Sequence, residues 1–342
     1  MLVQFLRSGL LALALQAGSD ASTPGQFLEL PGGTGGIGFD DLQFSARLGR
    51  LLVPGGRTGR LYLVDPKSLA VSSIEGFSPS KTFGGGHEQG ITSVGEGEGL
   101  LFVTDRTSLS LLVVDPGSNR ITARARLAAS PDYVRYVAPT REVWVTEPDK
   151  DQIEVFRLAA DAKEPPVHAA LIPIQNGPES LVVDATRVRA YTHLWEATTL
   201  AIDLKTRSVV ARWKNLCEGS RGIVLDEGRG FLFAGCSEGR GVTLDVAHDG
   251  RILGDLRTGA AGVDIIDYDR TLHHLYLPGG KSATMAILGV GRDGALKELG
   301  TAPSPAGGHC VVSDQAGRAY VCDPKAGRLT VVRDSFAPVS WR

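Results

Sequence analysis

The chain has 342 residues, a formal net charge of −2, 42% hydrophobic residues and 22% charged residues. These proportions are typical of a folded globular protein. The near-neutral charge and the lack of any Lys/Arg-rich run exclude the basic surface that a nucleic-acid-binding protein needs, so we expect no nucleic-acid partner. The 43 glycines indicate many tight turns, because glycine adopts the positive φ angles that such turns require.

The N-terminus has the pattern of an export signal. Arg7 precedes an apolar stretch over residues 9–17 that is too short to span a bilayer, and small residues follow at Ser19 and Ala21. We therefore expect residues 1–21 to be a signal peptide and the protein to act in the periplasm, at the cell surface or outside the cell. A short buried strand or helix and an uncleaved lipid-side anchor are the alternatives, and we expect no transmembrane segment elsewhere.

The rest of the chain repeats a pair of short apolar strands with a period of roughly 40 to 50 residues, which indicates propeller blades or a solenoid. The runs are rich in β-branched and aromatic residues and end at turn residues, and no apolar period of 3.6 residues persists, so we predict an all-β chain. The strand pairs occur in seven copies, at residues 50–53 and 61–65, 100–105 and 111–115, 142–146 and 153–156, 188–192 and 200–203, 231–235 and 242–245, 274–277 and 284–287, and 319–322 and 329–332.

Seven copies predict a seven-bladed β-propeller of four-stranded blades. The last copy lacks a fourth strand, whereas residues 26–30 form an apolar strand without a partner near the N-terminus. We predict that this strand completes the last blade and closes the ring, because closure removes an open sheet edge. Residues 22–342 are then expected to form a single propeller domain that acts as a monomer.

Several of these repeats carry a recognisable signature at residues 101–105, 190–192, 319–322 and, in one long run, 217–236. They resemble the YVTN-type, surface-layer-like family of seven-bladed β-propellers over nearly all of the mature chain. The resemblance implies the fold, and it implies a choice of functions that includes binding modules, cell-surface proteins and relatives of lactonases. The segment at residues 86–90 departs from the commoner pattern of the family, in which a histidine directly precedes the glycine that opens the strand.

Four cysteines form two local pairs, Cys217 with Cys236 and Cys310 with Cys322. An even number of cysteines in an exported chain predicts disulfides, and the spacing of a zinc site is missing. In each pair one cysteine precedes the first strand of a blade and the other ends its second strand. Antiparallel neighbours bring such positions into range, so we expect both bridges within blades and on one face.

The mouth of the central channel is the predicted working face, because polar groups that converge on a concave surface are the usual ligand site. We expect two kinds of position to line it. The openings of the first strands supply His87 to Gln89, Asp132 or Tyr133, Glu179, Arg221, Asp264 and His309, and the ends of the second strands supply Asp105, Glu147, His193, Cys236 and Cys322.

Three histidines of this set, His87, His193 and His309, suggest a metal site. Three imidazoles can hold Zn²⁺ or Cu²⁺ and leave a position for water, which the metal would activate as a nucleophile or base. An acidic residue of the rim would then orient a ligand or accept a proton, and Arg221 would hold a carboxylate, which makes catalytic candidates of Glu179, Arg221, Asp264 and Asp132. The alternative is that each histidine is simply a hydrogen-bonded rim residue.

We therefore predict first an exported binding module that presents its channel mouth to a small ligand, a metal or a protein partner. The alternatives are a metal-dependent hydrolase or lyase, lactonase-like in its reaction, and a carrier of copper or zinc. The two alternatives require one zinc or copper ion as cofactor or cargo, whereas the binding module does not.

Overall fold

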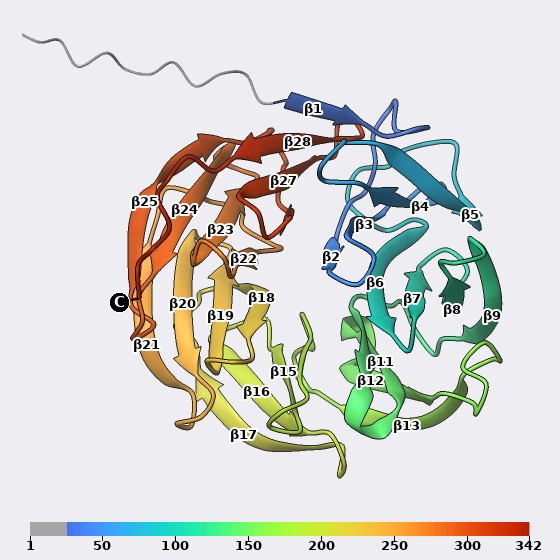
Figure 1. The fold of residues 1–342 in the computed structure, drawn as a ribbon. Helices are drawn as coiled ribbons and strands as arrows, with labels where there is room; N and C mark the ends of the chain where they lie inside the picture. The colour runs from blue at the N-terminus through green and yellow to red at the C-terminus, as the bar shows by residue number, and fades with distance from the viewer. Residues whose placement is uncertain (1–25, 342) are drawn as a thin grey trace, which may run out of the picture.

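Seven four-stranded antiparallel sheets stand radially around a central channel in the computed structural model, which describes residues 26–341 (Figure 1). The first strand of each blade lies innermost and the fourth lies at the outer edge. This arrangement confirms the predicted all-β propeller. Within the described residues, the helical elements are two short 3₁₀ turns, η1 (Ala138–Thr140) and η2 (Pro148–Lys150).

The blades follow one another along the chain, with the following bounds. The first three are β2 (Gln43–Ser45), β3 (Arg50–Pro54), β4 (Thr58–Val64) and β5 (Val71–Pro79); β6 (Ile91–Gly97), β7 (Leu100–Asp105), β8 (Ser110–Asp115) and β9 (Arg120–Arg126); and β10 (Val134–Val137), β11 (Glu142–Glu147), β12 (Gln152–Arg157) and β13 (Val167–Pro173). The next three are β14 (Val182–Asp184), β15 (Arg189–His193), β16 (Thr198–Asp203) and β17 (Ser208–Lys214); β18 (Ser220–Asp226), β19 (Phe231–Cys236), β20 (Arg240–Asp245) and β21 (Arg251–Arg257); and β22 (Asp267–Asp269), β23 (His274–Gly279), β24 (Thr284–Val290) and β25 (Leu296–Pro303).

The seventh blade closes the ring with a strand from the opposite end of the chain. It contains β26 (Val311–Ser313), β27 (Arg318–Asp323) and β28 (Arg328–Arg333), and β1 (Gln26–Glu29) is its outer strand. β1 runs antiparallel to β28, with Leu28 opposite Leu329. The predicted closure is thus present, and the strand ends one residue earlier than expected. The predicted signal peptide, residues 1–21, lies outside the described residues.

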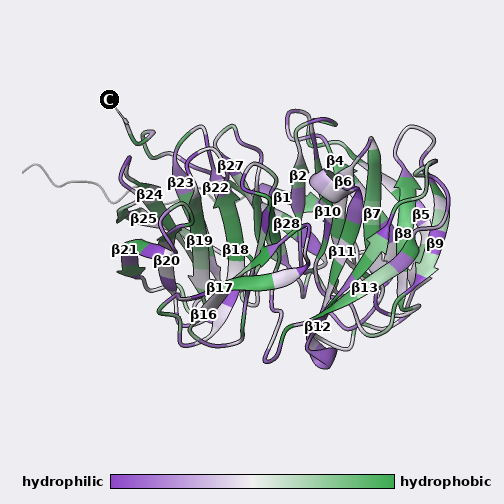
Figure 2. Cartoon of the chain, turned by 90° about the horizontal axis from the view of Figure 1, so that it is seen from below, coloured by the Kyte–Doolittle hydropathy of each residue, from purple (hydrophilic) through white to green (hydrophobic). Residues whose placement is uncertain are grey.

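The core lies between neighbouring blades, because the middle strands bury both of their faces. In β7, Leu101 and Val103 pack with Leu52 of the first blade. Phe102 points the other way and packs with Val143 of the third blade. Side chains alternate across a strand, so a continuous apolar run serves two interfaces at once. Figure 2 shows the result as hydrophobic strands with hydrophilic loops at both ends.

Both predicted disulfides form, and each lies within one blade. Cys217, just before β18, is bonded to Cys236 at the end of β19, with Cα atoms 5.1 Å apart. Cys310, just before β26, is bonded to Cys322 in β27, with Cα atoms 5.5 Å apart. The bridges fasten the inner strand of a blade to its neighbour beside the channel mouth. Within residues 26–341, no helix is long and apolar enough to cross a membrane.

Candidate functional site

Loops that precede the first strands turn inward and surround a cavity of about 300 Å³ at the mouth of the channel. Each of six consecutive blades contributes an ionisable side chain from this position. The lining comprises Asp40, His87, Glu88, Arg106, Ser130, Pro131, Asp132, Tyr133, Pro148, Asp149, Glu179, Trp195, Arg221 and Asp264. The structure therefore places Asp132, Glu179, Arg221 and Asp264, the four catalytic candidates from the sequence, around a single cavity.

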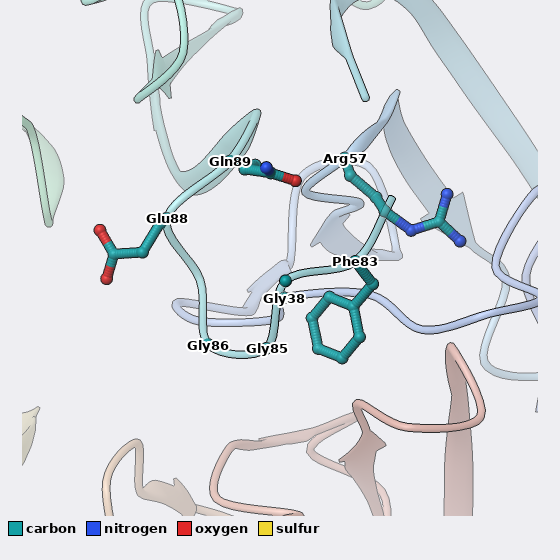
Figure 3. Close-up of a pocket in the computed structure, with 8 residues that line it drawn as sticks. Gly38, Arg57, Phe83, Gly85, Gly86, Glu88 and Gln89 are labelled. Atoms are coloured by element: carbon teal, nitrogen blue, oxygen red, sulfur yellow. The ribbon is translucent and has the colours of Figure 1, made fainter. Parts of the chain in front are cut away.

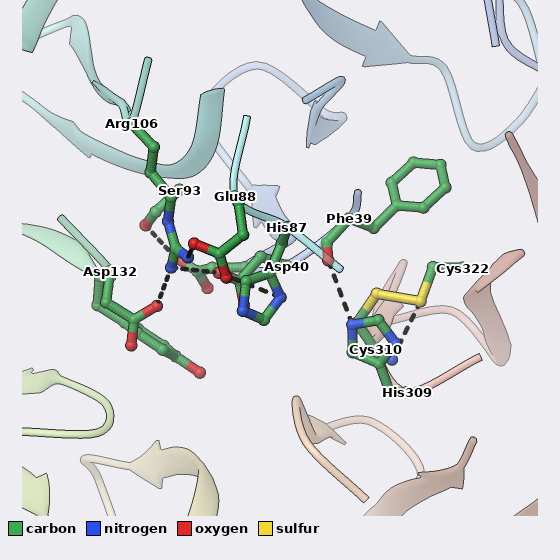
Figure 4. A network of polar contacts seen from close by, with 12 residues as sticks. Phe39, Asp40, His87, Glu88, Ser93, Arg106, Asp132, His309, Cys310 and Cys322 are labelled. Atoms are coloured by element: carbon green, nitrogen blue, oxygen red, sulfur yellow. Dashed lines mark hydrogen bonds and ion pairs between the residues drawn. A yellow bond between two sulfur atoms is a disulfide. The ribbon is translucent and has the colours of Figure 1, made fainter. Parts of the chain in front are cut away.

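A buried arginine connects three blades across one side of the cavity. Arg106 follows β7, and its side chain is only 8% exposed. One guanidinium nitrogen donates hydrogen bonds to Asp132 at 2.5 Å and to Asp40 at 3.1 Å. Figure 4 shows Arg106 between these two carboxylates, with His87 beside Asp40. Two buried carboxylates thus share a single positive charge.

Asp40 and Arg106 were not among the residues expected to line the mouth. Asp40 opens the first strand of blade one, as Asp132 does in blade three, but β2 has only three residues and leaves almost no apolar signal. Arg106 comes one residue after the expected position, Asp105. The repeat itself could have indicated Asp40, because an alignment of the blades puts an acidic residue at the opening of blade one.

The residues that end the second strands do not line the cavity. Asp105 accepts hydrogen bonds from the backbone N–H groups of Ser78 and Ser108, and Glu147 is likewise bonded to the N–H of Ala129. Cys236 and Cys322 are joined in the two bridges. The channel is reached one or two residues later, at Arg106, Pro148, Asp149 and Trp195.

His193 does not join the other two histidines of the expected metal set. It ends β15 fully buried, with Nδ1 2.9 Å from the hydroxyl of Thr199. Burial lowers the pKa of His193 to about 4, so the ring is neutral. The same hydroxyl of Thr199 accepts a hydrogen bond from Asn215. His193 is therefore a part of the packing between strands, as the alternative interpretation of the histidines proposed.

His87 and His309 do come together, and Asp264 takes the third place beside them. One ligand atom from each of the three residues lies within 4.8 Å of the others. His309 also lies as close to the sulfurs of Cys310 and Cys322, but these are joined in a disulfide and are not thiolates.

Burial gives the carboxylates of the cavity unusual protonation behaviour. It raises the pKa of Asp40 to about 7, against the opposing charge of Arg106. Burial likewise raises the pKa of Asp132 and of Glu179 well above the usual range of a carboxyl group, and their charges reinforce one another. Arg221 lies 3.6 Å from Glu179 and opposes the rise without cancelling it. These three carboxyl groups therefore bind protons more tightly than free carboxylates do, and an incoming positive charge favours the release of such protons.

Aromatic rings complete the wall of the cavity. The guanidinium of Arg221 lies over the ring of Trp195, with its central carbon 5.0 Å from the ring centroid. Trp195 is 38% exposed, so part of its ring remains open to a ligand. Tyr133 is buried in the floor, beneath the guanidinium of Arg135. An exposed indole beside carboxylates is a favourable surface for an organic cation.

The variant Glu179→Gln is expected to be more stable than the wild type. Its free energy of unfolding at pH 8 should be higher by about 0.5–2 kcal/mol. The folded protein holds a proton on Glu179 that the unfolded chain releases, so above the ordinary pKa this group costs stability as the pH rises. Urea unfolding at pH 5 and pH 8 measures the effect, and the gain should be larger at pH 8. A gain that shrinks as the pH rises would contradict the raised pKa.

Comparisons with known proteins show a similarity of fold and nothing more specific. No family model matches the chain, and no curated protein matches it. Among solved structures, it is similar to a chain of the mitotic checkpoint complex, with a TM-score of 0.72 and 13% identity over 96% of this chain and 99% of that one. It is also similar to a chain of Kuenenia stuttgartiensis hydrazine synthase, with a TM-score of 0.69 and 13% identity over 94% and 99%. The β-propeller domain of Myceliophteria thermophila Cps50 (Swd1) matches with a TM-score of 0.72 and 11% identity over 91% and 99%. The chain is a seven-bladed β-propeller, a scaffold that serves many functions.

Proposed function

We propose that the protein is an exported binding module whose channel mouth takes up a small, positively charged ligand. The observation that carries this proposal is the charge of the cavity. Six carboxyl groups line it, from Asp40, Glu88, Asp132, Asp149, Glu179 and Asp264, and only two guanidinium groups, from Arg106 and Arg221.

The two arginines do not offset this excess. Arg106 is already bonded to Asp40 and Asp132, and Arg221 lies beside Glu179. Three of the carboxyl groups, from Asp40, Asp132 and Glu179, are buried, and buried charges of one sign are costly unless they are paired or protonated. A cationic ligand supplies the missing positive charge and releases the stored protons, so its binding is favoured by the site as it stands.

Export is supported by two features. Both cysteine pairs are bonded, and disulfides persist mainly in oxidising compartments. The first 21 residues have the pattern of a signal peptide. We therefore place the binding module in the periplasm, at the cell surface or outside the cell, where the mouth is open to small ligands and to proteins that carry a basic side chain.

A series of four-carbon compounds that differ in charge tests the proposal. Putrescine (two positive charges), 1,4-butanediol (neutral) and succinate (two negative charges) are titrated into the protein, with calorimetry and the intrinsic tryptophan fluorescence, to which Trp195 contributes, as readouts. We expect saturable binding of putrescine at one site and no binding of the other two. Tighter binding of succinate than of putrescine would contradict the proposal.

Two variants locate the site of putrescine binding. Glu179→Gln should weaken it at least about tenfold, because a hydrogen bond to a charged group is worth about 1.5–3 kcal/mol. Glu75→Gln, which removes an exposed carboxylate from the outer strand β5, should leave the affinity unchanged. Equal losses in both variants would show that putrescine binds to the surface charge in general.

The cluster of His87, Asp264 and His309 favours a second candidate function, a metal-dependent hydrolase or lyase that acts on lactones or esters, or a carrier of zinc or copper. If the protein is an enzyme, we expect the metal-loaded protein to hydrolyse a lactone, and we expect Arg221→Lys to abolish turnover while the metal is retained. In the carrier, the metal is bound and transferred without turnover. Release of the hydroxy acid from γ-butyrolactone and other simple lactones distinguishes the two.

A further inference from the structure

Two imidazole rings and one carboxylate converge where blades two, six and seven meet the channel. The ring centroids of His87 and His309 are 6.2 Å apart, and the rings are tilted by 55°, so they are not stacked. Asp264 is held beside His309 by the backbone, since the N–H of Ile265 donates to the carbonyl of His309 at 3.0 Å. The three side chains thus come from separate loops and reach one point.

The backbone orients the ring of His309. Its Nδ1 lies 2.7 Å from the carbonyl oxygen of Gly307. A carbonyl oxygen only accepts, so Nδ1 carries a proton, and when the ring is neutral its lone pair is at Nε2. This is the arrangement that fixes the metal-binding nitrogen of histidine ligands in proteins.

The second nitrogen of His309 faces another acceptor. Its Nε2 lies 3.2 Å from the carbonyl oxygen of Phe39. When Nε2 is protonated it donates a hydrogen bond to this oxygen, so a metal bound to Nε2 must displace that contact. Asp40, the residue after Phe39, has a carboxylate oxygen 4.0 Å from Nδ1 of His87. Asp40 thus adds a negative charge beside the two histidines.

His87 follows three glycines that are open on one side, whereas the backbone of Gly86 and His87 packs against Gly38. A Cβ atom added at Gly84, Gly85 or Gly86 would meet no atom within 4 Å. A second cavity of about 150 Å³ adjoins this segment, and its lining includes Arg57, Phe83 and the three glycines; Figure 3 shows it. Within residues 26–341, the ring of His87 makes no hydrogen bond, and its side chain is 30% exposed. The ring of His87 therefore gives up no hydrogen bond when it rotates toward the other two residues.

We infer that His87, Asp264 and His309 bind one transition-metal dication, Zn²⁺ or Cu²⁺, at this corner of the cavity. The inference rests on the proposed function, because it names the class of cation that the site takes. Imidazole nitrogen is a ligand that zinc and copper prefer, whereas calcium and magnesium prefer oxygen. Tetrahedral ligands 2.0–2.1 Å from zinc lie about 3.3 Å apart, so the atoms now within 4.8 Å must close slightly, and rotation of the His87 ring provides the movement.

Metal binding to the full chain, purified without a histidine tag and without reductant, tests the inference. Equilibrium dialysis against Zn²⁺ or Cu²⁺ should load one equivalent. His309→Gln and Asp264→Asn should each weaken binding at least about 100-fold, and the Cu²⁺ spectrum in electron paramagnetic resonance should show two nitrogen ligands that fall to one in His87→Gln. No stoichiometric metal, or metal retained in all three variants, would overturn the inference.

Two further variants provide controls on folding and position. His193→Gln, outside the cluster, should keep the metal, and loss of the metal in this variant as well would overturn the inference. Gly38→Ala leaves every ligand in place but puts a Cβ atom 2.3 Å from the carbonyl oxygen of Gly86 and 2.8 Å from the Cα atom of His87. It should weaken metal binding by displacing His87, and unchanged affinity would contradict the role of His87.

Putrescine binding separates failure of this inference from failure of the proposed function. Protein that binds putrescine saturably but takes up no stoichiometric metal would overturn the metal site and leave the cationic cavity standing. Protein that binds neither would overturn both.

Discussion

Replacement of Arg106 with leucine is expected to lower the free energy of unfolding by about 3–5 kcal/mol at pH 8, because it leaves Asp40 and Asp132 buried without their shared partner. The loss should be smaller at pH 5. Both carboxyl groups have raised pKa values, so they are protonated in the folded protein at low pH and no longer need the guanidinium. Urea unfolding at the two pH values measures both effects.

The matched control is Arg47→Leu. Arg47 is paired with Glu96 at the surface of the same part of the ring, and its side chain is 46% exposed. Exposed ion pairs contribute about 0–1 kcal/mol, so this variant should remain close to the wild type at both pH values. Similar losses of free energy of unfolding in Arg47→Leu and Arg106→Leu would mean that the buried network stabilises the protein no more than an exposed ion pair does.

Leu28→Ala is expected to cost about 2–5 kcal/mol, the range for truncating a buried leucine. Leu28 is the buried residue of β1, and it lies opposite Leu329 in the blade that joins the two ends of the chain. Loss of its packing weakens the ring closure and exposes an edge of β28. Denaturant unfolding measures the loss, and a lower midpoint with an unchanged slope is expected.

Phe27→Ala serves as the control for the closing strand. The neighbouring side chain points outward and is 49% exposed, with the guanidinium of Arg328 3.6 Å from its ring centroid. An exposed contact of this kind is worth about 0.5–1 kcal/mol. If Phe27→Ala costs as much as Leu28→Ala, the closing strand is not held by its buried face.

The strand pairs could be predicted because the middle strands of a blade bury both faces. The run from Leu100 to Asp105 is apolar almost throughout, since Leu101 and Phe102 pack against different neighbouring blades. Such runs stand out from the polar turns between them. The cysteine pairs could be predicted for a similar reason, because their spacing matches two antiparallel neighbours within a blade.

The inner strands were harder to predict, and the positions of the site residues depend on them. β2 has three residues, so the first blade opens with almost no apolar pattern, and only an alignment with the other blades points to Asp40. The position of Arg106 depends on where the chain leaves β7, which varies by a residue between blades. A shift of one residue turns a strand side chain to the opposite face, and this is why Asp105 is buried while Arg106 reaches the cavity.

The direction of each histidine could not be predicted either. His193 ends its second strand as expected, but its ring bonds to the hydroxyl of Thr199 and does not line the cavity. His309 precedes a first strand and reaches the corner where His87 and Asp264 lie. Which partner captures a ring depends on packing between blades, and a repeat pattern carries no information about that packing.

The claim that the mouth binds a cation through carboxylates is tested most directly by titrating putrescine into the wild-type protein at pH 6 and pH 8, in two buffers with different ionisation enthalpies. Putrescine keeps both charges over this range, whereas Asp40, with a pKa of about 7, and Asp132 and Glu179, with strongly raised pKa values, hold protons. The account predicts tighter binding at pH 8, and a binding heat that differs between the buffers because protons are released. Equal or weaker binding at pH 8, with the same heat in both buffers, would contradict it.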